Sequence, residues 1–141
     1  MVQRSLAALV ILATVMTVAV VTAQKVDPKN SATILRVSQM GFQSLLAEGK
    51  LLIIDVRDAA SFDAGRIPGA INVPLLEVEK RIDEIRTKAA GRPIVAYCSC
   101  PAEHSAAEAG LVLYKNGLRD VRALIGGYPE WVRNGGKIEK H

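Results

Sequence analysis

Short runs of consecutive apolar residues recur along the chain, and between them apolar residues are spaced three or four apart. The continuous runs are rich in β-branched residues and are typical of strands buried on both faces of a sheet. They occupy residues 51–56, 71–73, 93–97 and 121–125, and Pro74 ends the second run. The pattern therefore predicts several short, fully buried strands.

Segments with helical spacing separate these strands. Residues 37–49 carry apolar side chains on one helical face, with Ser38 as a candidate N-cap and Gly49 as a candidate stop. Residues 75–91 predict a surface helix with its charges facing outward. A further helix is expected to end near Gly117, and a short one to follow the last strand.

Alternating strands and helices predict an α/β fold, with a parallel central sheet of about five strands flanked by helices on both faces. We expect a linker at residues 24–33 and a single domain at residues 34–141. Residues 58–70 are rich in turn-forming residues and are expected to form a connection. The aromatic side chains of Phe62 and Trp131 are expected in the core.

The N-terminus has the pattern of an export segment. Arg4 supplies a positive charge, residues 5–23 contain no charged residue, and small residues lead up to Ala23. This pattern is typical of a signal peptide cleaved after Ala23, and the apolar stretch is also long enough to be an uncleaved membrane anchor. We therefore expect an exported protein, either periplasmic or secreted, or anchored to the membrane by residues 5–23.

Charged residues are scattered along the chain. Lysine and arginine number 18 against 14 aspartate and glutamate, a net charge of +4. The charges do not gather into a basic patch, so the composition argues against a nucleic-acid partner. Contact with a membrane is expected only through the N-terminal segment.

The two cysteines of the chain stand two residues apart, where a predicted strand meets a predicted helix. Cys98 directly follows residues 93–97, and Cys100 precedes Pro101. A disulfide between them would close a very small ring that staples little of the fold and is easily reduced. Ligands bind at the carboxyl ends of parallel strands, and both the turn's N–H groups and the helix N-terminus would stabilise a Cys98 thiolate there. We interpret Cys98 as the candidate nucleophile.

Three segments follow one another in an order and spacing that form a known pattern. They are Asp55-Val56-Arg57 with Phe62, Gly65-Arg66-Ile67-Pro68-Gly69-Ala70 and Asn72-Val73-Pro74; residues 94–98; and residues 124–136 with their Gly-Gly, aromatic and Trp positions. In this order the segments resemble the rhodanese-like domain family, and the resemblance covers residues 34–138. Residues 94–98 are similar to the strand that delivers the family's catalytic cysteine.

The resemblance implies a sulfurtransferase. In such enzymes a cysteine thiolate attacks the outer sulfur of a donor such as thiosulfate, sulfite leaves, and the persulfide passes its sulfur to a thiophilic acceptor. By position, Cys98 would be the nucleophile, and the backbone from Ser99 to His104 would cradle the persulfide. The resemblance implies no metal or organic cofactor. Its expected partners are a small sulfur-containing anion or a thiol acceptor, and a protein partner.

The loop after Cys98 departs from the family's pattern of a cysteine, four residues, an arginine and a small hydroxyl residue. No arginine stands there, and the next basic side chain is His104, six positions on. Two helix starts fit the sequence. Pro101 suits a first helical position, and Ser105 with Glu108 forms a capping box. The start at Pro101 is preferred, because a proline followed by an acidic residue suits a first helical turn.

The remaining candidate residues have alternative roles. Those that could contact substrate are Ser99, Ala102, Glu103, His104, Ser105, Arg57 and Arg66. Asp55 is expected to have a structural role at its strand end. Arg57 either pairs with an acidic neighbour or supplies charge to the site, and Arg66 occupies the family's usual histidine position. Cys100 is a second thiol that attacks a persulfide, a resolving thiol in redox chemistry, or a small buried residue.

Two rival functions stay open. The absence of the loop arginine favours a non-catalytic module that binds a protein or a small anion, and in that case a Cys98→Ser variant would keep full partner binding. The second rival is a thiol–disulfide redox role for Cys98 and Cys100. A phosphatase is disfavoured, because Glu103 stands where phosphate would need firm positive charge.

Overall fold

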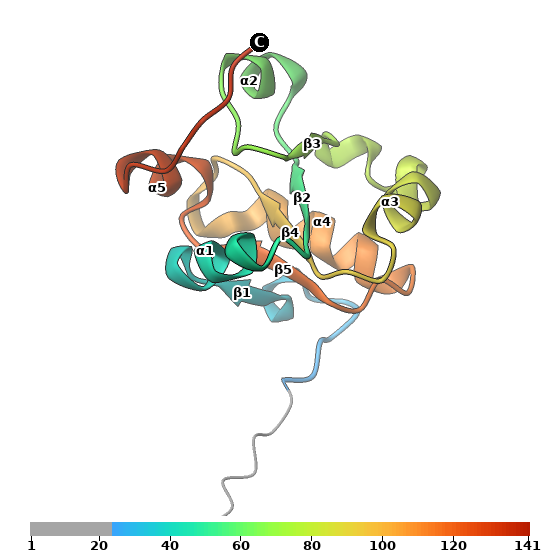
Figure 1. Cartoon of the computed structure of the whole chain (residues 1–141). Helices are drawn as coiled ribbons and strands as arrows, with labels where there is room; N and C mark the ends of the chain where they lie inside the picture. Colours follow the sequence, from blue (N-terminus) through green and yellow to red (C-terminus); the bar gives the residue numbers. More distant parts are fainter. Residues whose placement is uncertain (1–23) are drawn as a thin grey trace, which may run out of the picture.

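A computed structural model describes residues 24–141, and its centre is a five-stranded sheet (Figure 1). The strands are β1 (Leu35–Val37), β2 (Leu52–Asp55), β3 (Ile71–Asn72), β4 (Ile94–Tyr97) and β5 (Val121–Leu124). They lie in the order β1-β5-β4-β2-β3, and every neighbouring pair is parallel. The predicted α/β fold with about five parallel strands is therefore confirmed.

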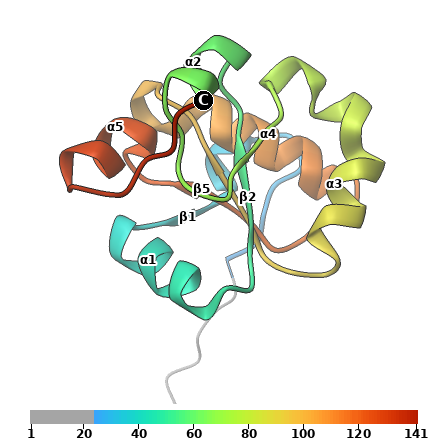
Figure 2. The same ribbon diagram turned by 45° about the horizontal axis from the view of Figure 1, so that its top comes forward.

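Helices cover both faces of this sheet. They are α1 (Gln39–Glu48), α2 (Ala59–Ala64), α3 (Ile82–Ala89), α4 (His104–Lys115) and α5 (Gly127–Arg133). Helices α1 and α5 pack on one face, and α3 and α4 pack on the other (Figures 1 and 2). Helix α2 lies beyond the end of the sheet, close to the C-terminus of the chain.

The three inner strands β2, β4 and β5 supply both cores because successive side chains point to opposite faces. Val95 and Tyr97 of β4 pack with Phe42 and Trp131 in the core under α1 and α5. Ala96, between them, joins the larger core under α3 and α4. A strand with apolar neighbours on both sides must be apolar throughout, which explains the continuous hydrophobic runs.

Helix α1 has the two end signals expected from the sequence. The Ser38 hydroxyl accepts a hydrogen bond of 3.1 Å from the N–H of Gly41, so it satisfies one of the free donors at the helix start. Gly49 ends the helix in the left-handed conformation with φ of 66°. Both predictions are confirmed.

The connection at residues 58–70 contains a helix that the turn-rich sequence did not predict. The Asp58 carboxylate caps α2 by accepting a 2.8 Å hydrogen bond from the Ser61 N–H. The prediction for Phe62 was wrong. Its ring is only half-buried, with the Arg66 guanidinium stacked 4.7 Å from the ring centre. Trp131, in contrast, lies in the core as predicted.

The predicted helix at residues 75–91 is α-helical only in its second half. It starts as two 3₁₀ turns, Leu75–Glu77 and Glu79–Arg81, before α3. Arg81 interrupts the helix with φ of −108°, and its guanidinium donates a 2.9 Å hydrogen bond to the carbonyl of Asn72. The apolar spacing fits both helix types, so it did not reveal the break.

The segment expected to be a linker packs partly against the domain. Val26 is buried in the larger core, and residues Ser31–Thr33 form a 3₁₀ turn capped by the Asn30 side chain. The predicted signal peptide or membrane anchor at residues 1–23 lies outside the described residues. Within residues 24–141, no helix has both the length and the apolar character needed to cross a bilayer.

Candidate active site

Cys98 directly follows β4, the middle strand of the sheet. On one side, the Val56 N–H after β2 donates a 3.0 Å hydrogen bond to the carbonyl of Tyr97. On the other side, the Tyr128 N–H in α5 donates a 2.9 Å hydrogen bond to the carbonyl of Cys98. Cys98 therefore lies at the carboxyl edge of the sheet, between two neighbouring strand ends, where parallel sheets bind ligands.

The two cysteine sulfurs are joined in a disulfide. The Cα atoms of Cys98 and Cys100 are 5.7 Å apart, within the usual range for this bond. Cys98 is only 3% exposed, whereas Cys100 is half-buried and Ser99 between them is exposed. In this state the Cys98 sulfur is both bonded and covered, so its use as a nucleophile first requires reduction.

The loop between the disulfide and α4 has two successive residues in the left-handed region. Pro101–Glu103 forms a 3₁₀ turn, and Ala102 and Glu103 have φ of 53° and 54°. Each such residue costs about 1–2 kcal/mol when it is not glycine. These two residues break the helical path, so α4 begins at His104 and neither predicted start is right: Pro101 begins only the 3₁₀ turn.

The N-terminal end of α4 points at Cys100. The N–H of Ser105, the second residue of the helix, donates a 3.3 Å hydrogen bond to the Cys100 sulfur. Within residues 24–141, this is the one hydrogen bond from a main-chain N–H to a cysteine sulfur. The sequence predicts such hydrogen bonds at Cys98 instead. Ser105 therefore serves through its backbone, not as the side-chain cap that the sequence suggested.

Glu103 ties the loop to the turn after β5. Its carboxylate accepts a 2.8 Å hydrogen bond from the N–H of Gly126, and its other oxygen lies 4.0 Å from the Arg36 guanidinium. The Glu103 side chain is only 14% exposed. A charged carboxylate that accepts a main-chain N–H contributes more than a neutral hydrogen bond, so the partly buried Glu103 offsets part of the backbone strain in this loop.

We expect Glu103→Ala to loosen the loop. The change removes the acceptor of the Gly126 N–H and leaves this donor without its partner, so the free energy of unfolding should fall by about 1–3 kcal/mol. Hydrogen exchange at the Gly126 amide should become faster. Glu108→Ala is the matched control, because Glu108 is an exposed glutamate in α4, the helix that follows this loop. Equal stability of the two variants in urea would contradict the assigned contact.

Asp55 and Arg57 form a buried ion pair at the end of β2. The Arg57 guanidinium donates to both carboxylate oxygens, with Nη2 2.6 Å from Oδ2 and Nε 2.9 Å from Oδ1. It also donates to the carbonyl of Gly65 and stacks 4.0 Å from the centre of the Tyr128 ring. Burial opposes the charge of Arg57, but the hydrogen bond and charge of Asp55 raise its pKa above the usual value.

Of the two expectations for Arg57, the structure shows the pairing with an acidic neighbour. Nε and Nη2 are engaged by Asp55 and Gly65, so the guanidinium helps to position the strand end and α5. Asp55 is fully buried and also accepts a 2.9 Å hydrogen bond from the N–H of Arg57. The expected structural role of Asp55 agrees with this geometry.

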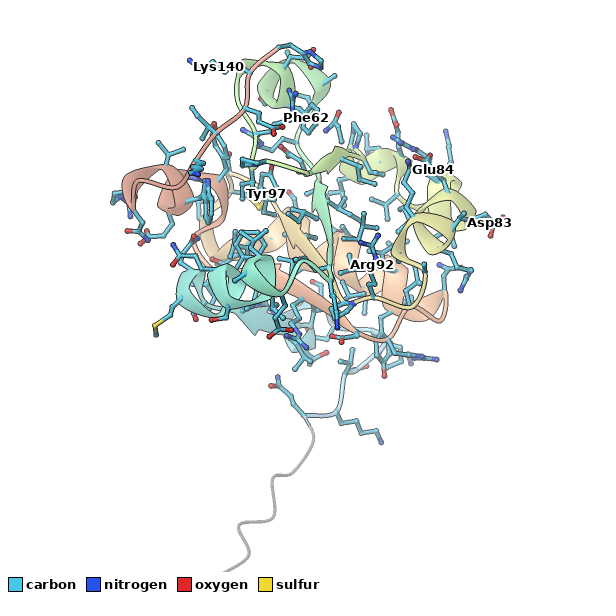
Figure 3. The ribbon with its side chains drawn as sticks, viewed as in Figure 1. Phe62, Asp83, Glu84, Arg92, Tyr97 and Lys140 are labelled. Atoms are coloured by element: carbon cyan, nitrogen blue, oxygen red, sulfur yellow. A yellow bond between two sulfur atoms is a disulfide. The ribbon has the colours of Figure 1, made fainter. Side chains whose placement is uncertain are left out.

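The sequence analysis missed the aromatic pair beside the candidate nucleophile. Tyr97 (labelled in Figure 3) is fully buried, and its hydroxyl accepts a 3.2 Å hydrogen bond from the N–H of Ile67. Burial raises the pKa of Tyr97 far above its ordinary value, so the phenol stays neutral. Its ring stacks with Tyr128 at 6.2 Å. Only the position of Tyr97, next to Cys98 in sequence, could have drawn attention to it.

Arg66 and His104, two of the predicted substrate contacts, have other neighbours in the structure. Arg66 stacks on Phe62 and pairs with Glu139, and the backbones of Arg66 and Glu139 form a bridge near the C-terminus. His104 is exposed and lines a hollow of about 190 Å³ with Arg36 and Ala102. The structure thus brings together Cys98, Cys100, the Ser105 N–H and the loop that Glu103 holds. Arg36 escaped prediction because it comes from β1, far away in sequence.

The family model described as "Rhodanese-like domain" matches residues 38–134 of this chain. Among curated proteins, the "Uncharacterized protein YqhL" of Bacillus subtilis is 38% identical over 90 residues, which are 64% of this chain and 65% of that protein. The human "Thiosulfate:glutathione sulfurtransferase" is 44% identical over 46 residues, 33% of this chain and 40% of that protein. The chain thus spans less than two thirds of the length of either relative.

Solved structures have the same fold. The "Human Single Domain Sulfurtranferase TSTD1" superposes with a TM-score of 0.59 and 28% sequence identity. The match covers 70% of this chain and 95% of the human chain. The fold of this chain is therefore similar to that of a protein whose name describes sulfur transfer.

Proposed function

We propose, from the premise that this chain belongs to the rhodanese-like domain family, that it is a sulfurtransferase acting through a persulfide on Cys98. The donor is a sulfane-sulfur anion such as thiosulfate, and the acceptor is a thiophilic group such as a thiol. The observation that carries the proposal is the position of Cys98, a thiol at the carboxyl end of the middle strand.

The reaction divides into two nucleophilic steps. In the first, the Cys98 thiolate attacks the outer sulfur of thiosulfate. A bond forms between the two sulfurs, the sulfur–sulfur bond of thiosulfate breaks, and its electron pair leaves with sulfite. In the second step, an acceptor attacks the outer sulfur of the persulfide and returns Cys98 as a thiolate. The protein supplies the position of the thiol at the end of β4.

Reduction of the disulfide comes before this reaction. The bond to Cys100 blocks the Cys98 sulfur, and Cys98 is only 3% exposed while the bond is present. Once the bond is broken, the half-buried Cys100 side chain is free to turn away and open the approach to Cys98. The strained backbone at Ala102 and Glu103 lowers the cost of moving the loop.

The test is sulfite release in a single turnover. The full chain is reduced with a dithiol, the dithiol is removed, thiosulfate is added without air, and sulfite is measured. We expect about one sulfite per wild-type chain and none from Cys98→Ser, whose fold is checked by denaturant unfolding. If reduced wild-type protein releases no sulfite, the chain is not a thiosulfate sulfurtransferase, and a binding module becomes the better interpretation.

The disulfide itself favours a second candidate, a thiol–disulfide redox function of Cys98 and Cys100. Export, as residues 5–23 predict, would bring the pair into an oxidising compartment where disulfides persist. In that case reduced protein would pass electrons to a disulfide substrate, both Cys98→Ser and Cys100→Ser would lose this activity, and thiosulfate would release no sulfite. Sulfite release that needs Cys98 but not Cys100 favours sulfur transfer.

A further inference from the structure

We infer that Cys100 is a built-in acceptor, which discharges the Cys98 persulfide as hydrogen sulfide and leaves the Cys98–Cys100 disulfide. This inference rests on the proposed function, because it begins with the persulfide on Cys98. It identifies the product of the site and the chemical class of its partner. The product is hydrosulfide, and the partner is an external dithiol that reduces the disulfide again.

The backbone holds Cys100 close enough to attack. The two sulfurs are bonded in the structure, and the Cα atoms lie 5.7 Å apart. Two residues that are separated by one intervening residue can lie at most about 7 Å apart, so reduction cannot carry Cys100 far away. An attacking group held at such short range has a large advantage over the same group free in solution.

Electrostatics select Cys100 as the attacking thiolate. Its sulfur accepts the 3.3 Å hydrogen bond from the Ser105 N–H at the start of α4, and both this N–H and the helix dipole favour a negative sulfur. Once Cys98 carries the persulfide, Cys100 is the remaining thiol of the pair. The N–H at the start of α4 therefore favours the anion that attacks in this step.

Position decides which sulfur of the persulfide each nucleophile reaches first. The inner atom of the persulfide is the Cys98 sulfur, at the end of β4, and Cys100 is held beside it by the short chain between them. Cys100 already touches this atom in the disulfide. An external acceptor would have to take the outer sulfur, whereas Cys100 attacks the inner one and expels the outer one.

The step balances. The Cys100 thiolate forms a bond to the Cys98 sulfur, the bond between the inner and outer sulfurs of the protonated persulfide breaks, and the electron pair leaves with the outer sulfur as hydrosulfide. The two cysteine sulfurs are oxidised and the sulfane sulfur is reduced. The external dithiol then attacks the more exposed Cys100 sulfur, Cys98 leaves as a thiolate, and the dithiol ends as its own disulfide.

A single turnover tests this inference. The full chain is reduced, freed of reductant and mixed with thiosulfate without air. Sulfite, sulfide, free thiols and intact mass are then measured. We expect wild-type protein to release one sulfite and one sulfide per chain, to lose both thiols, and to carry no added sulfur. Cys100→Ser should release one sulfite and no sulfide, and should keep one extra sulfur atom on Cys98. Cys100→Ala should behave in the same way.

The outcomes separate this inference from the proposed function. If wild-type protein releases sulfite but no sulfide and keeps the extra sulfur on Cys98, sulfur transfer stands and the role of Cys100 is overturned. Sulfide release that is equal in wild-type and Cys100→Ser protein also overturns it. If no variant releases sulfite, the proposed function fails, and the inference fails with it.

Discussion

Asp55→Ala should lower the free energy of unfolding by about 3–5 kcal/mol, the usual cost of removing one partner of a buried ion pair. Asp55 is fully buried, and the Arg57 side chain is only 9% exposed. Without the carboxylate, the guanidinium would remain buried with its charge uncompensated. The N–H of Arg57 would also lose its acceptor. Urea unfolding of the two proteins measures the difference.

Asp120→Ala is the matched control for the Asp55 prediction. The Asp120 carboxylate pairs with Arg122 at 3.0 Å, but the two side chains are 48% and 30% exposed. Exposed pairs contribute about 0–1 kcal/mol, so this variant should be nearly as stable as wild type. Asp55→Asn keeps a hydrogen-bond acceptor but loses the charge, so its loss should lie between the other two. Equal losses for Asp55→Ala and Asp120→Ala would show that burial does not matter at this strand end.

The Asp55–Arg57 pair stabilises the structure around Cys98 and has no role in the proposed sulfur transfer. Arg57 stacks on Tyr128, and the N–H of Tyr128 holds the carbonyl of Cys98. Removing the carboxylate should therefore disturb the position of Cys98 through α5. Arg57 thus contacts the surroundings of Cys98 through packing, while the N–H that reaches a cysteine sulfur comes from the start of α4.

Most of the fold could be predicted from the sequence, because burial on both faces of a parallel sheet leaves continuous apolar runs. The runs at residues 51–56 and 93–97 became β2 and β4. Strand β1 was missed, since its three residues are too few for a pattern and it borders only β5. The break at Arg81 was missed for another reason. It depends on a hydrogen bond to Asn72, and hydropathy carries no information about such contacts.

Motif order and the strand end both pointed to Cys98 as the candidate nucleophile, and the structure places Cys98 at the end of β4. The sequence did not indicate which of the two sulfurs a main-chain N–H would reach. The left-handed backbone at Ala102 and Glu103 has no signal in the sequence, because glycine usually occupies such positions. That backbone turns the Ser105 N–H towards Cys100, so the expectation of an anion nest around Cys98 failed. The final arrangement depends on a loop conformation that tertiary contacts such as Glu103 with Gly126 hold in place.

Gly127→Ala tests whether close contact with α5 holds the backbone of Cys98 in place. Gly127 is buried with φ of 51°, and an added Cβ would collide with the carbonyl oxygen of Cys98. The backbones cannot simply separate, because the adjacent Tyr128 N–H bonds to that same oxygen at 2.9 Å. The left-handed conformation should cost about 1–2 kcal/mol and the overlap about 1–3 kcal/mol more. The free energy of unfolding should therefore fall by about 2–5 kcal/mol.

Gly49→Ala separates the two contributions. Gly49 has φ of 66°, but nothing lies within 4 Å of an added Cβ, so only the conformational cost applies. Urea unfolding should show a larger loss for Gly127→Ala than for Gly49→Ala. Hydrogen exchange at the Tyr128 amide should become faster only in the first variant. If the two losses are equal, α5 does not press on the Cys98 backbone, and the nucleophile must be positioned by β4 and the following loop alone.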